Sequence, residues 1–255
     1  MPDIELINKR IQRNNENNDI VSIVVPTYQE AENLRPLITR IHSVMSIFNR
    51  AYEVIIVDDN SQDGTDGVII ELVNEGYPVK LITRIDARGL SSAVVRGFLE
   101  ARGYIFVCMD ADLSHPPEKI PQLIECIEDD GWEFVIGSRY VPGASTEEAW
   151  GALRWLNSKI AILLALPFSN AKDPMSGFFA LPRNLFERAD SLDPVGYKIG
   201  LELIVKCSCK KIYEVPIHFT NRVYGQSKLS LKEQFNYINH LKRLVYYKYS
   251  KIFRC

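Results

Sequence analysis

The chain has 255 residues, of which 46% are apolar, and a formal net charge of −2 at pH 7. This length allows one large domain or two small ones with a full hydrophobic core, and the near-neutral charge gives no argument for nucleic acid as a partner. The five cysteines include no Cys-x-x-Cys pair, which favours reduced, mostly buried thiols over a disulfide framework or a zinc site.

Residues 1–19 are polar and rich in Asn, and we expect them to form a leader outside the folded domain. The N-terminus has no apolar signal-peptide core. The longest apolar run, residues 160–168, is shorter than the roughly 20 residues that a membrane-spanning helix needs. We therefore expect a soluble or peripheral protein.

From residue 20 onward, short apolar segments alternate with helical patterns. Strands are expected at residues 21–25 (stopped by Pro26), 54–57, 79–83, 105–109 and 134–137. Helices are expected near residues 30–48, 64–74, 91–102 and 117–129. This alternation predicts an α/β fold with a mostly parallel sheet flanked by helices.

The pattern changes after Tyr140. A helix is expected near residues 150–166, strands near 177–181 and 212–218, and a helix near 231–249. We interpret the first half as nucleotide-binding and the second as acceptor-binding, within one domain of residues 20–230. Residues 231–255 follow as a C-terminal helix and a basic, aromatic tail.

Two carboxylates one residue apart, Asp110 and Asp112, follow the fourth expected strand. In an extended chain they would point to the same side. Two hard oxygen ligands suit Mg²⁺ or Mn²⁺, which complete their shells with water and phosphate oxygens. The alternative is a solvated acidic turn that precedes the next helix.

Acidic motifs also follow the first two expected strands, at residues 26–30 and 58–65. The carboxyl ends of parallel strands form the ligand-binding edge of such sheets. Tyr28 can stack on a base, and Asp59 can accept hydrogen bonds from a base or a ribose. Asp63 also fits an Asx turn at a helix start, and we expect its role to be mainly structural.

A series of motifs in this order resembles the family 2 glycosyltransferases. They are P-T-Y-x-E at 26–30, V-D-D-x-S-x-D-G-T at 57–65, R-G-L-S-S-A at 88–93, D-A-D-L-S-H-P at 110–116 and G-S-R-Y at 137–140. The later runs S-G-F-F at 176–179, G-Y-K at 196–198 and R-x-x-G-x-S-K-L at 222–229 narrow the resemblance to the dolichyl-phosphate mannosyltransferases without membrane spans.

The resemblance implies a GT-A fold, an inverting transfer and a divalent ion, Mg²⁺ or Mn²⁺. It implies GDP-mannose as donor and dolichyl or another polyprenyl phosphate as acceptor. UDP-glucose or another nucleotide sugar, an undecaprenyl phosphate, and a polysaccharide or protein acceptor are alternatives. A non-catalytic nucleotide-binding protein is disfavoured by the aspartate pair, and a dinucleotide-dependent oxidoreductase by the lack of G-x-G-x-x-G after the first strand.

Carried onto matching positions, the resemblance implies a set of donor-site residues. They are Pro26, Tyr28, Glu30, Val57 and Asp59 for the nucleoside, Asp110, Ala111 and Asp112 for metal and diphosphate, and Arg222 and Lys228 as a diphosphate clamp. Ser114 stands where some relatives carry a metal-binding Gln, and its shorter side chain would reach the ion through a water.

A lipid monophosphate is already anionic near neutral pH, so it needs placement against cations more than it needs a strong base. Arg139, Arg154 and Ser158 are the candidates for binding that phosphate, and the last two share one face of a predicted helix. Asp173 lies where other family 2 enzymes keep a catalytic carboxylate, as a possible base or sugar-hydroxyl ligand.

Two segments suit a membrane surface. Residues 155–168 are rich in Ile, Leu and Ala, and the tail from Lys242 alternates basic with aromatic side chains. The alternatives are a core helix and a solvated helix end. We expect peripheral attachment to the cytosolic face of a membrane, of the endoplasmic reticulum in a eukaryote or the plasma membrane in a prokaryote. Short relatives often have small membrane-protein partner subunits.

Overall fold

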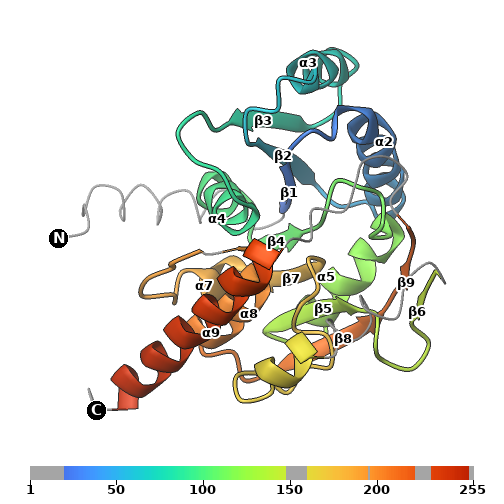
Figure 1. The fold of residues 1–255 in the computed structure, drawn as a ribbon. Coiled ribbons are helices and arrows are strands. Elements are labelled where there is room, and N and C mark those ends of the chain that lie inside the picture. The colour runs from blue at the N-terminus through green and yellow to red at the C-terminus, as the bar shows by residue number, and fades with distance from the viewer. Residues whose placement is uncertain (1–19, 148–159, 195, 222–230, 253–255) are drawn as a thin grey trace, which may run out of the picture.

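The structure is a computed structural model that describes residues 20–147, 160–194, 196–221 and 231–252. A seven-stranded sheet lies at its centre, in the order β3-β2-β1-β4-β7-β5-β8 (Figure 1). Only β7 runs antiparallel to its neighbours β4 and β5, and the other pairs in this sheet are parallel. The prediction of a mostly parallel sheet flanked by helices is confirmed.

The strands of this sheet are β1 Val21–Thr27, β2 Tyr52–Asp58, β3 Val79–Thr83, β4 Ile105–Cys108, β5 Phe134–Ser138, β7 Phe179–Pro182 and β8 Ile212–Pro216. A separate pair consists of β6 Ser145–Thr146 and β9 His218–Phe219. The helices are α2 Ala31–Phe48, α3 Thr65–Asn74, α4 Leu90–Glu100, η1 Pro117–Lys119, α5 Ile120–Glu128, α7 Arg183–Phe186, α8 Ile199–Lys206 and α9 Leu231–Ile252.

Strand β1 continues through Pro26, which was expected to stop it. The carbonyl of Val24 accepts a hydrogen bond from the N–H of Met109, so the backbone N–H and C=O groups of Val24 point toward β4. Pro26, two residues further on, faces the same side, where β4 has already ended at Cys108. The missing proline N–H therefore interrupts no ladder bond.

Two apolar clusters cover the two faces of the sheet. Helices α2, α3 and α5 contribute to one cluster, for example through Leu37 and Leu123. Helices α4, α7 and α8 contribute to the other, for example through Phe98 and Leu203. Successive side chains of β1 pack into opposite clusters, and all of them are buried. This burial on both faces explains why the parallel strands are continuous apolar runs in the sequence.

The second half of the chain differs more from expectation. Helices α7 and α8 were not predicted. With four residues, α7 is too short to show a helical period, and α8 is a short, mostly apolar run that periodicity cannot distinguish from a strand. The expected strand at 212–218 is split into β8 and β9. The expected helix at 150–166 lies largely outside the described residues, which resume in helical conformation at 160–165.

Helix α9 confirms the expected C-terminal helix and packs on α8 (Figure 1). Leu241 and Leu244 of α9 share a buried cluster with Leu201 of α8. None of the helices in the described part of the chain has the length and apolar character needed to span a membrane.

Candidate active site

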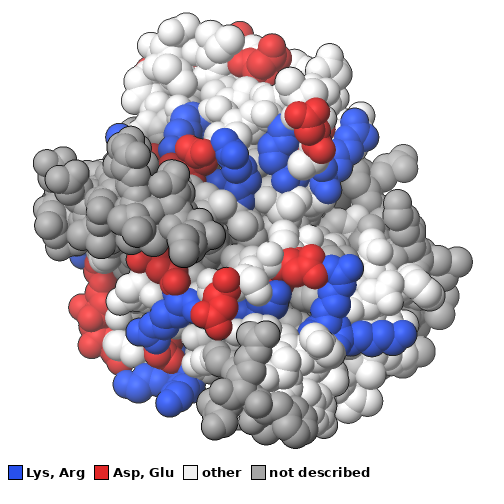
Figure 2. Space-filling model, turned by 90° about the vertical axis from the view of Figure 1, so that its left-hand side faces the viewer, with Lys and Arg blue, Asp and Glu red and all other residues white. Residues whose placement is uncertain are grey.

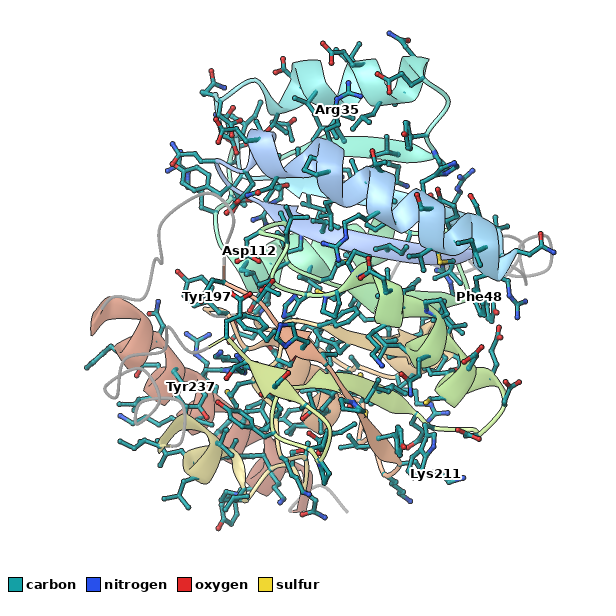
Figure 3. All side chains as sticks on the ribbon, turned by 90° about the vertical axis from the view of Figure 1, so that its right-hand side faces the viewer. Arg35, Phe48, Asp112, Tyr197, Lys211 and Tyr237 are labelled. Atoms are coloured by element: carbon teal, nitrogen blue, oxygen red, sulfur yellow. The ribbon has the colours of Figure 1, made fainter. Side chains whose placement is uncertain are left out.

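The loops that follow β1, β2, β4 and β5 carry the predicted site residues at one end of the sheet. In Figure 3, Asp112 and Tyr197 lie toward this end, whereas Phe48 at the end of α2 lies toward the opposite one. This is the edge where open α/β sheets bind ligands.

The loops after β1 and β2 are fastened to each other by short polar side chains. The buried Asp58 carboxylate accepts hydrogen bonds from the N–H and hydroxyl of Ser61, whose oxygen accepts one from the N–H of Gln29 at 2.8 Å. Asp63 accepts from the N–H groups of Ala31 and Thr65, at the starts of α2 and α3. Burial opposes its charge, but the hydrogen bond from the Thr65 hydroxyl, together with these N–H bonds, outweighs burial and lowers the pKa of Asp63. Its expected structural role is confirmed.

Asp59 is held by a cation that the sequence did not single out. Arg84, directly after β3, donates from Nε to Asp59 Oδ1 at 2.7 Å and also from Nη2. The N–H of Gly89 donates to Oδ2 at 2.7 Å. Gly89 has φ = +130°, a conformation that favours glycine. Both side chains of the pair are more than 90% buried, so the orientation of Asp59 is fixed.

Tyr28 and Glu30 are the partly exposed side chains at the end of β1. The guanidinium of Arg88 lies 5.1 Å from the centre of the Tyr28 ring, and Glu30 accepts a hydrogen bond from Asn33. Pro26 and Val57 are buried partners in the register of β1 and β2. Of the predicted nucleoside set, Tyr28 and Glu30 therefore present the accessible side-chain surface.

Asp110 and Asp112 lie beyond β4, which ends at Cys108, in a bent segment. Strand alternation therefore does not orient them, and that part of the sequence argument was wrong. Leu113 is in the left-handed region, at φ = +63°. Asp112 is buried and accepts hydrogen bonds at Oδ1 from both the N–H and the hydroxyl of Ser114, whereas Asp110 is partly exposed. Ser114 thus fixes the position of Asp112.

The Asp110 carboxylate lies against Gly177 of the segment before β7. A Cβ atom at Gly177 would come within 2.8 Å of Asp110 Oδ1, so a larger residue there would displace the carboxylate. The described residues contain no group of three or more His, Cys, Asp or Glu able to enclose a metal. The aspartate pair thus fits an ion that takes most of its ligands from water and phosphate oxygens, as Mg²⁺ does.

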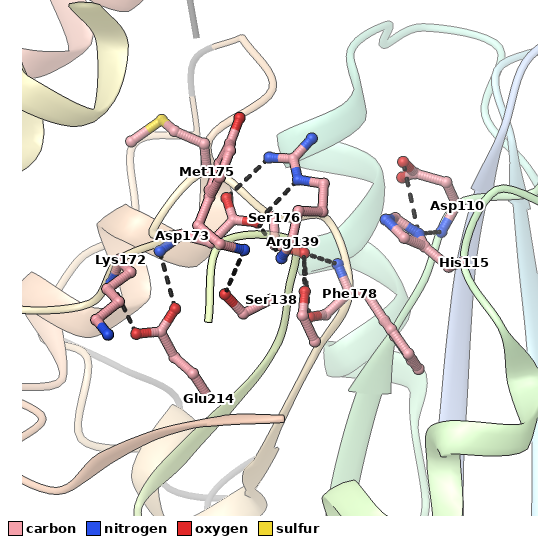
Figure 4. Close-up of polar contacts among 12 residues, drawn as sticks. Asp110, His115, Ser138, Arg139, Lys172, Asp173, Met175, Ser176, Phe178 and Glu214 are labelled. Carbon is pink, nitrogen blue, oxygen red and sulfur yellow. Dashed lines mark hydrogen bonds and ion pairs between the residues drawn. The ribbon is translucent and has the colours of Figure 1, made fainter. Parts of the chain in front are cut away.

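His115 is buried beside this pair, with its ring stacked on Phe178 at 5.4 Å (Figure 4). The N–H of Asp110 donates to His115 Nδ1 at 3.1 Å. Nδ1 is therefore the acceptor in this contact. Nδ1 also lies 3.7 Å from Asp110 Oδ2, but an unprotonated nitrogen makes no ion pair.

Arg139 and Asp173 form a two-pronged ion pair at the end of β5 (Figure 4). Nε and Nη2 of Arg139 each donate to Asp173 at 2.8 Å, and the Arg139 N–H donates to the same carboxylate at 3.0 Å. Burial disfavours the guanidinium charge, but Asp173 outweighs burial and raises the pKa of Arg139. Glu214 of β8 accepts from the N–H groups of Lys172 and Asp173, which fixes the segment that carries Asp173.

Lys198, just before α8, is a second cation on this side. The sequence places Lys198 in the G-Y-K motif at 196–198, but no role was predicted for it. Its ammonium donates to the carbonyl of Met175 at 3.4 Å. Burial first, and then the charge of Arg139, lower the pKa of Lys198 to about 8, while Asp173 and Asp110 act in the opposite direction.

Arg154, Ser158, Arg222 and Lys228 lie outside the described residues, and their roles stay predictions. Thr220, just before the predicted clamp, donates from its N–H to the carbonyl of Ser114 and from its hydroxyl to that of Leu113. The end of β9 is thereby joined to the loop that carries Asp112.

The family model for glycosyl transferase family 2 matches residues 22–189. The chain belongs to glycosyltransferase family 2. This transferase is 48% identical over 229 residues to a dolichol-phosphate mannosyltransferase of Pyrococcus furiosus, in an alignment that covers 88% of this chain but only 63% of that relative. It is 43% identical to the protein of that name in Saccharomyces cerevisiae, over 89% of this chain and 88% of the relative.

Solved structures confirm the expected GT-A fold of the transferase. Mannosyl-3-phosphoglycerate synthase from Rubrobacter xylanophilus superposes with a TM-score of 0.64 at 19% identity, over 99% of this chain and 85% of that one. Glucosyl-3-phosphoglycerate synthase from Mycobacterium tuberculosis, solved with Mn²⁺ and UDP-glucose, gives 0.63 at 19% identity, over 94% and 81%. At this identity the likeness concerns the fold alone.

Proposed function

We propose that this glycosyltransferase moves mannose from GDP-mannose to dolichyl phosphate or a related polyprenyl phosphate, with inversion at the anomeric carbon. The observation that carries the proposal is the identity of 43–48%, along about nine tenths of the chain, to proteins named dolichol-phosphate mannosyltransferase. The fixed carboxylates at the sheet edge support the same conclusion.

Tyr28, Glu30 and Asp59 would hold the nucleoside. The buried residues Pro26, Val57 and Ala111 would form the floor of the site. The support is that Arg84 and Gly89 hold Asp59 in one orientation before any ligand binds. Pre-oriented polar groups lose little freedom when the ligand arrives. Arg222 and Lys228 would contact the diphosphate.

Asp110 and Asp112 would hold Mg²⁺ or Mn²⁺, with Ser114 positioning Asp112 and contacting the ion through a water. When bound, the ion would neutralise the charge that develops on the departing GDP. The buried hydrogen bonds from Ser114, which fix Asp112, support this assignment, as does Gly177, which leaves room for the Asp110 carboxylate.

Arg139, together with Arg154 and Ser158, would bind the acceptor phosphate. The phosphate can attack the anomeric carbon without a strong base, because it is already anionic near neutral pH. Both oxygens of Asp173 accept hydrogen bonds from Arg139. This geometry favours a positioning role for Asp173, which holds Arg139 in place, over the role of base or sugar ligand.

The membrane surface is the proposed second partner, contacted by α9 and residues 160–168. These segments adjoin each other, since Tyr237 donates to the carbonyl of Ala161 and Lys248 to that of Pro167. They expose apolar and aromatic side chains: Leu163, Leu166, Phe235, Tyr246 and Tyr249. Basic residues on the same helix suit an anionic headgroup region.

Attachment to the cytosolic face, and small membrane-protein subunits that cover part of this surface, belong to the same proposal. The boundary between a transferase domain and a C-terminal region at residues 230/231 also stays a proposal, since α9 packs on α8.

On the face shown in Figure 2, the described Lys and Arg side chains are interspersed with Asp and Glu. Proteins that bind nucleic acid typically carry a basic patch instead.

The test is a donor and acceptor screen on the purified full chain in detergent. Labelled GDP-mannose, UDP-glucose and UDP-N-acetylglucosamine are each offered with dolichyl or undecaprenyl phosphate, in Mg²⁺, Mn²⁺ or EDTA. We expect label in the lipid phase only with GDP-mannose and a divalent ion. Faster transfer from UDP-glucose, or full activity in EDTA, would contradict the proposal.

A further inference from the structure

Lys198 is a partly buried cation with little to satisfy it. Among the described residues, its one hydrogen bond is the 3.4 Å contact to the carbonyl of Met175, and no carboxylate lies within ion-pair distance. The other inward-facing lysine of this region, Lys206 at the end of α8, pairs with Glu202 at 2.8 Å. Removing an ammonium from water without a counter-ion is unfavourable. The contacts within the fold therefore do not explain why a lysine lies at position 198.

The surroundings of Lys198 are those of the active site. Met175 lies beside the Arg139–Asp173 pair in Figure 4, and Gly177, two residues later, packs against Asp110. The lowered pKa of Lys198 has Arg139 as its main charged cause and is opposed by Asp173 and Asp110. The ammonium thus lies within electrostatic reach of the predicted acceptor and metal groups, and Asp173 is already neutralised by Arg139.

An anion would supply the missing counter-charge. The donor nucleoside has its own fixed partners around Asp59 and Tyr28, on β1 and β2. Lys198 lies instead on the side built from β5, β7 and α8, with Arg139. A phosphate monoester is the anion that the proposed reaction brings to this side, and it accepts hydrogen bonds from several donors at once.

We propose that Lys198 binds the acceptor phosphate directly, as a second cation beside Arg139, and holds it for attack on the donor sugar. The inference rests on the proposed function and extends it by a residue on the acceptor side. A compact ammonium complements the planar guanidinium, because it can donate in directions that the paired Arg139 cannot.

The test compares Lys198→Met, Lys198→Arg and the matched control Lys172→Met in the full chain. Lys172 is exposed and lies on the far side of Asp173 from Asp110 in Figure 4. We expect Lys198→Met to raise the KM for polyprenyl phosphate by at least about 10-fold. GDP affinity, measured by calorimetry with Mn²⁺, should change less than about twofold. Lys198→Arg should recover part of the loss, and Lys172→Met should behave as wild type.

Stability is a second readout. Because Lys198→Met removes an ammonium without a close counter-ion, it should raise the melting temperature by about 2–4 °C while activity falls. An unchanged acceptor KM in Lys198→Met would overturn the inference. So would an equal loss of GDP affinity, since Lys198 would then serve the donor.

Binding of farnesyl phosphate to the chain loaded with GDP and Mn²⁺ separates this inference from the proposed function. If the wild type binds it in a Lys198-dependent way but transfers no mannose, the proposed donor is wrong and the inference holds. If the wild type transfers mannose and Lys198→Met keeps its acceptor KM, the inference fails and the function holds. If the wild type does not bind the probe at all, both are overturned.

Discussion

The proposed donor and acceptor sides of the active-site edge hold their charged groups in different ways. On the donor side, after β1, β2 and β4, carboxylates are held mainly by groups close in sequence, as Asp112 is by Ser114 two residues away. On the acceptor side, Arg139 is 34 residues from Asp173, and Asp173 is 41 residues from Glu214. Contacts between residues close in sequence form a motif that can be recognised in the sequence. The contacts of the acceptor side join distant residues, and they form only when the sheet is assembled.

The donor side can be broken at its metal site. Asp112→Ala removes a proposed metal ligand and should lower turnover by at least about 10³-fold. The lost hydrogen bonds to Ser114 should cost only about 1–2 kcal/mol of unfolding free energy, so the fold persists. Steady-state kinetics with Mg²⁺ or Mn²⁺ and thermal denaturation measure the two effects. The exposed Asp66→Ala is the control, and a near wild-type rate for Asp112→Ala would refute the assignment.

The acceptor side can be broken at its long-range ion pair. Asp173→Asn leaves Arg139 buried without a charged partner, which should cost about 3–5 kcal/mol of stability. If Asp173 positions Arg139, the acceptor KM rises as well. If Asp173 is instead a base, the maximal rate falls at an unchanged acceptor KM.

A double variant separates stability from function on this side. Replacing both partners, Arg139→Met with Asp173→Leu, should recover most of the lost stability without recovering activity, because neither member of the pair is left buried without the other. The exposed pair Arg96–Glu100 is the control, where Arg96→Met should cost less than about 1 kcal/mol. Chemical denaturation of all variants gives the comparison.

Asp59 differs from Asp112 in that its partner Arg84 is 25 residues away. Arg84→Lys keeps the charge but loses the planar fork, and should weaken GDP binding by about 10-fold with the acceptor KM unchanged. Calorimetry with GDP and Mn²⁺ measures the change, and Arg40→Lys in an exposed ion pair is the control. Unaltered GDP affinity in Arg84→Lys would show that the orientation of Asp59 does not matter.

The same contrast explains what could be predicted from sequence. The strands and helices of the first half were recognised because short apolar runs and helical patterns alternate regularly, with errors of a few residues at element ends. Helix α8 was missed, since residues 199–206 are as apolar as a strand. That β7 runs antiparallel could not be inferred, because no pattern in one strand states the direction of its neighbour.

Within the site, position after a strand was the informative signal. It identified Asp59 and Asp110, and applied to Arg84 after β3 it would have found that residue too. The pairing of Arg139 with Asp173 was inaccessible, because it depends on how β5 and β7 lie together. The positions of Arg154, Ser158, Arg222 and Lys228 stay predictions.

The pairing of Arg139 with Asp173 has a consequence for the net charge that this edge presents to its ligands. At pH 7 the formal charges of Asp110, Asp112, Arg139, Asp173 and Lys198 sum to −1, because Arg139 cancels only the charge of its partner Asp173. A divalent ion would reverse that sign. With the ion bound, this part of the edge would attract a nucleotide diphosphate more strongly than without it, and we therefore expect the ion to favour binding of the donor.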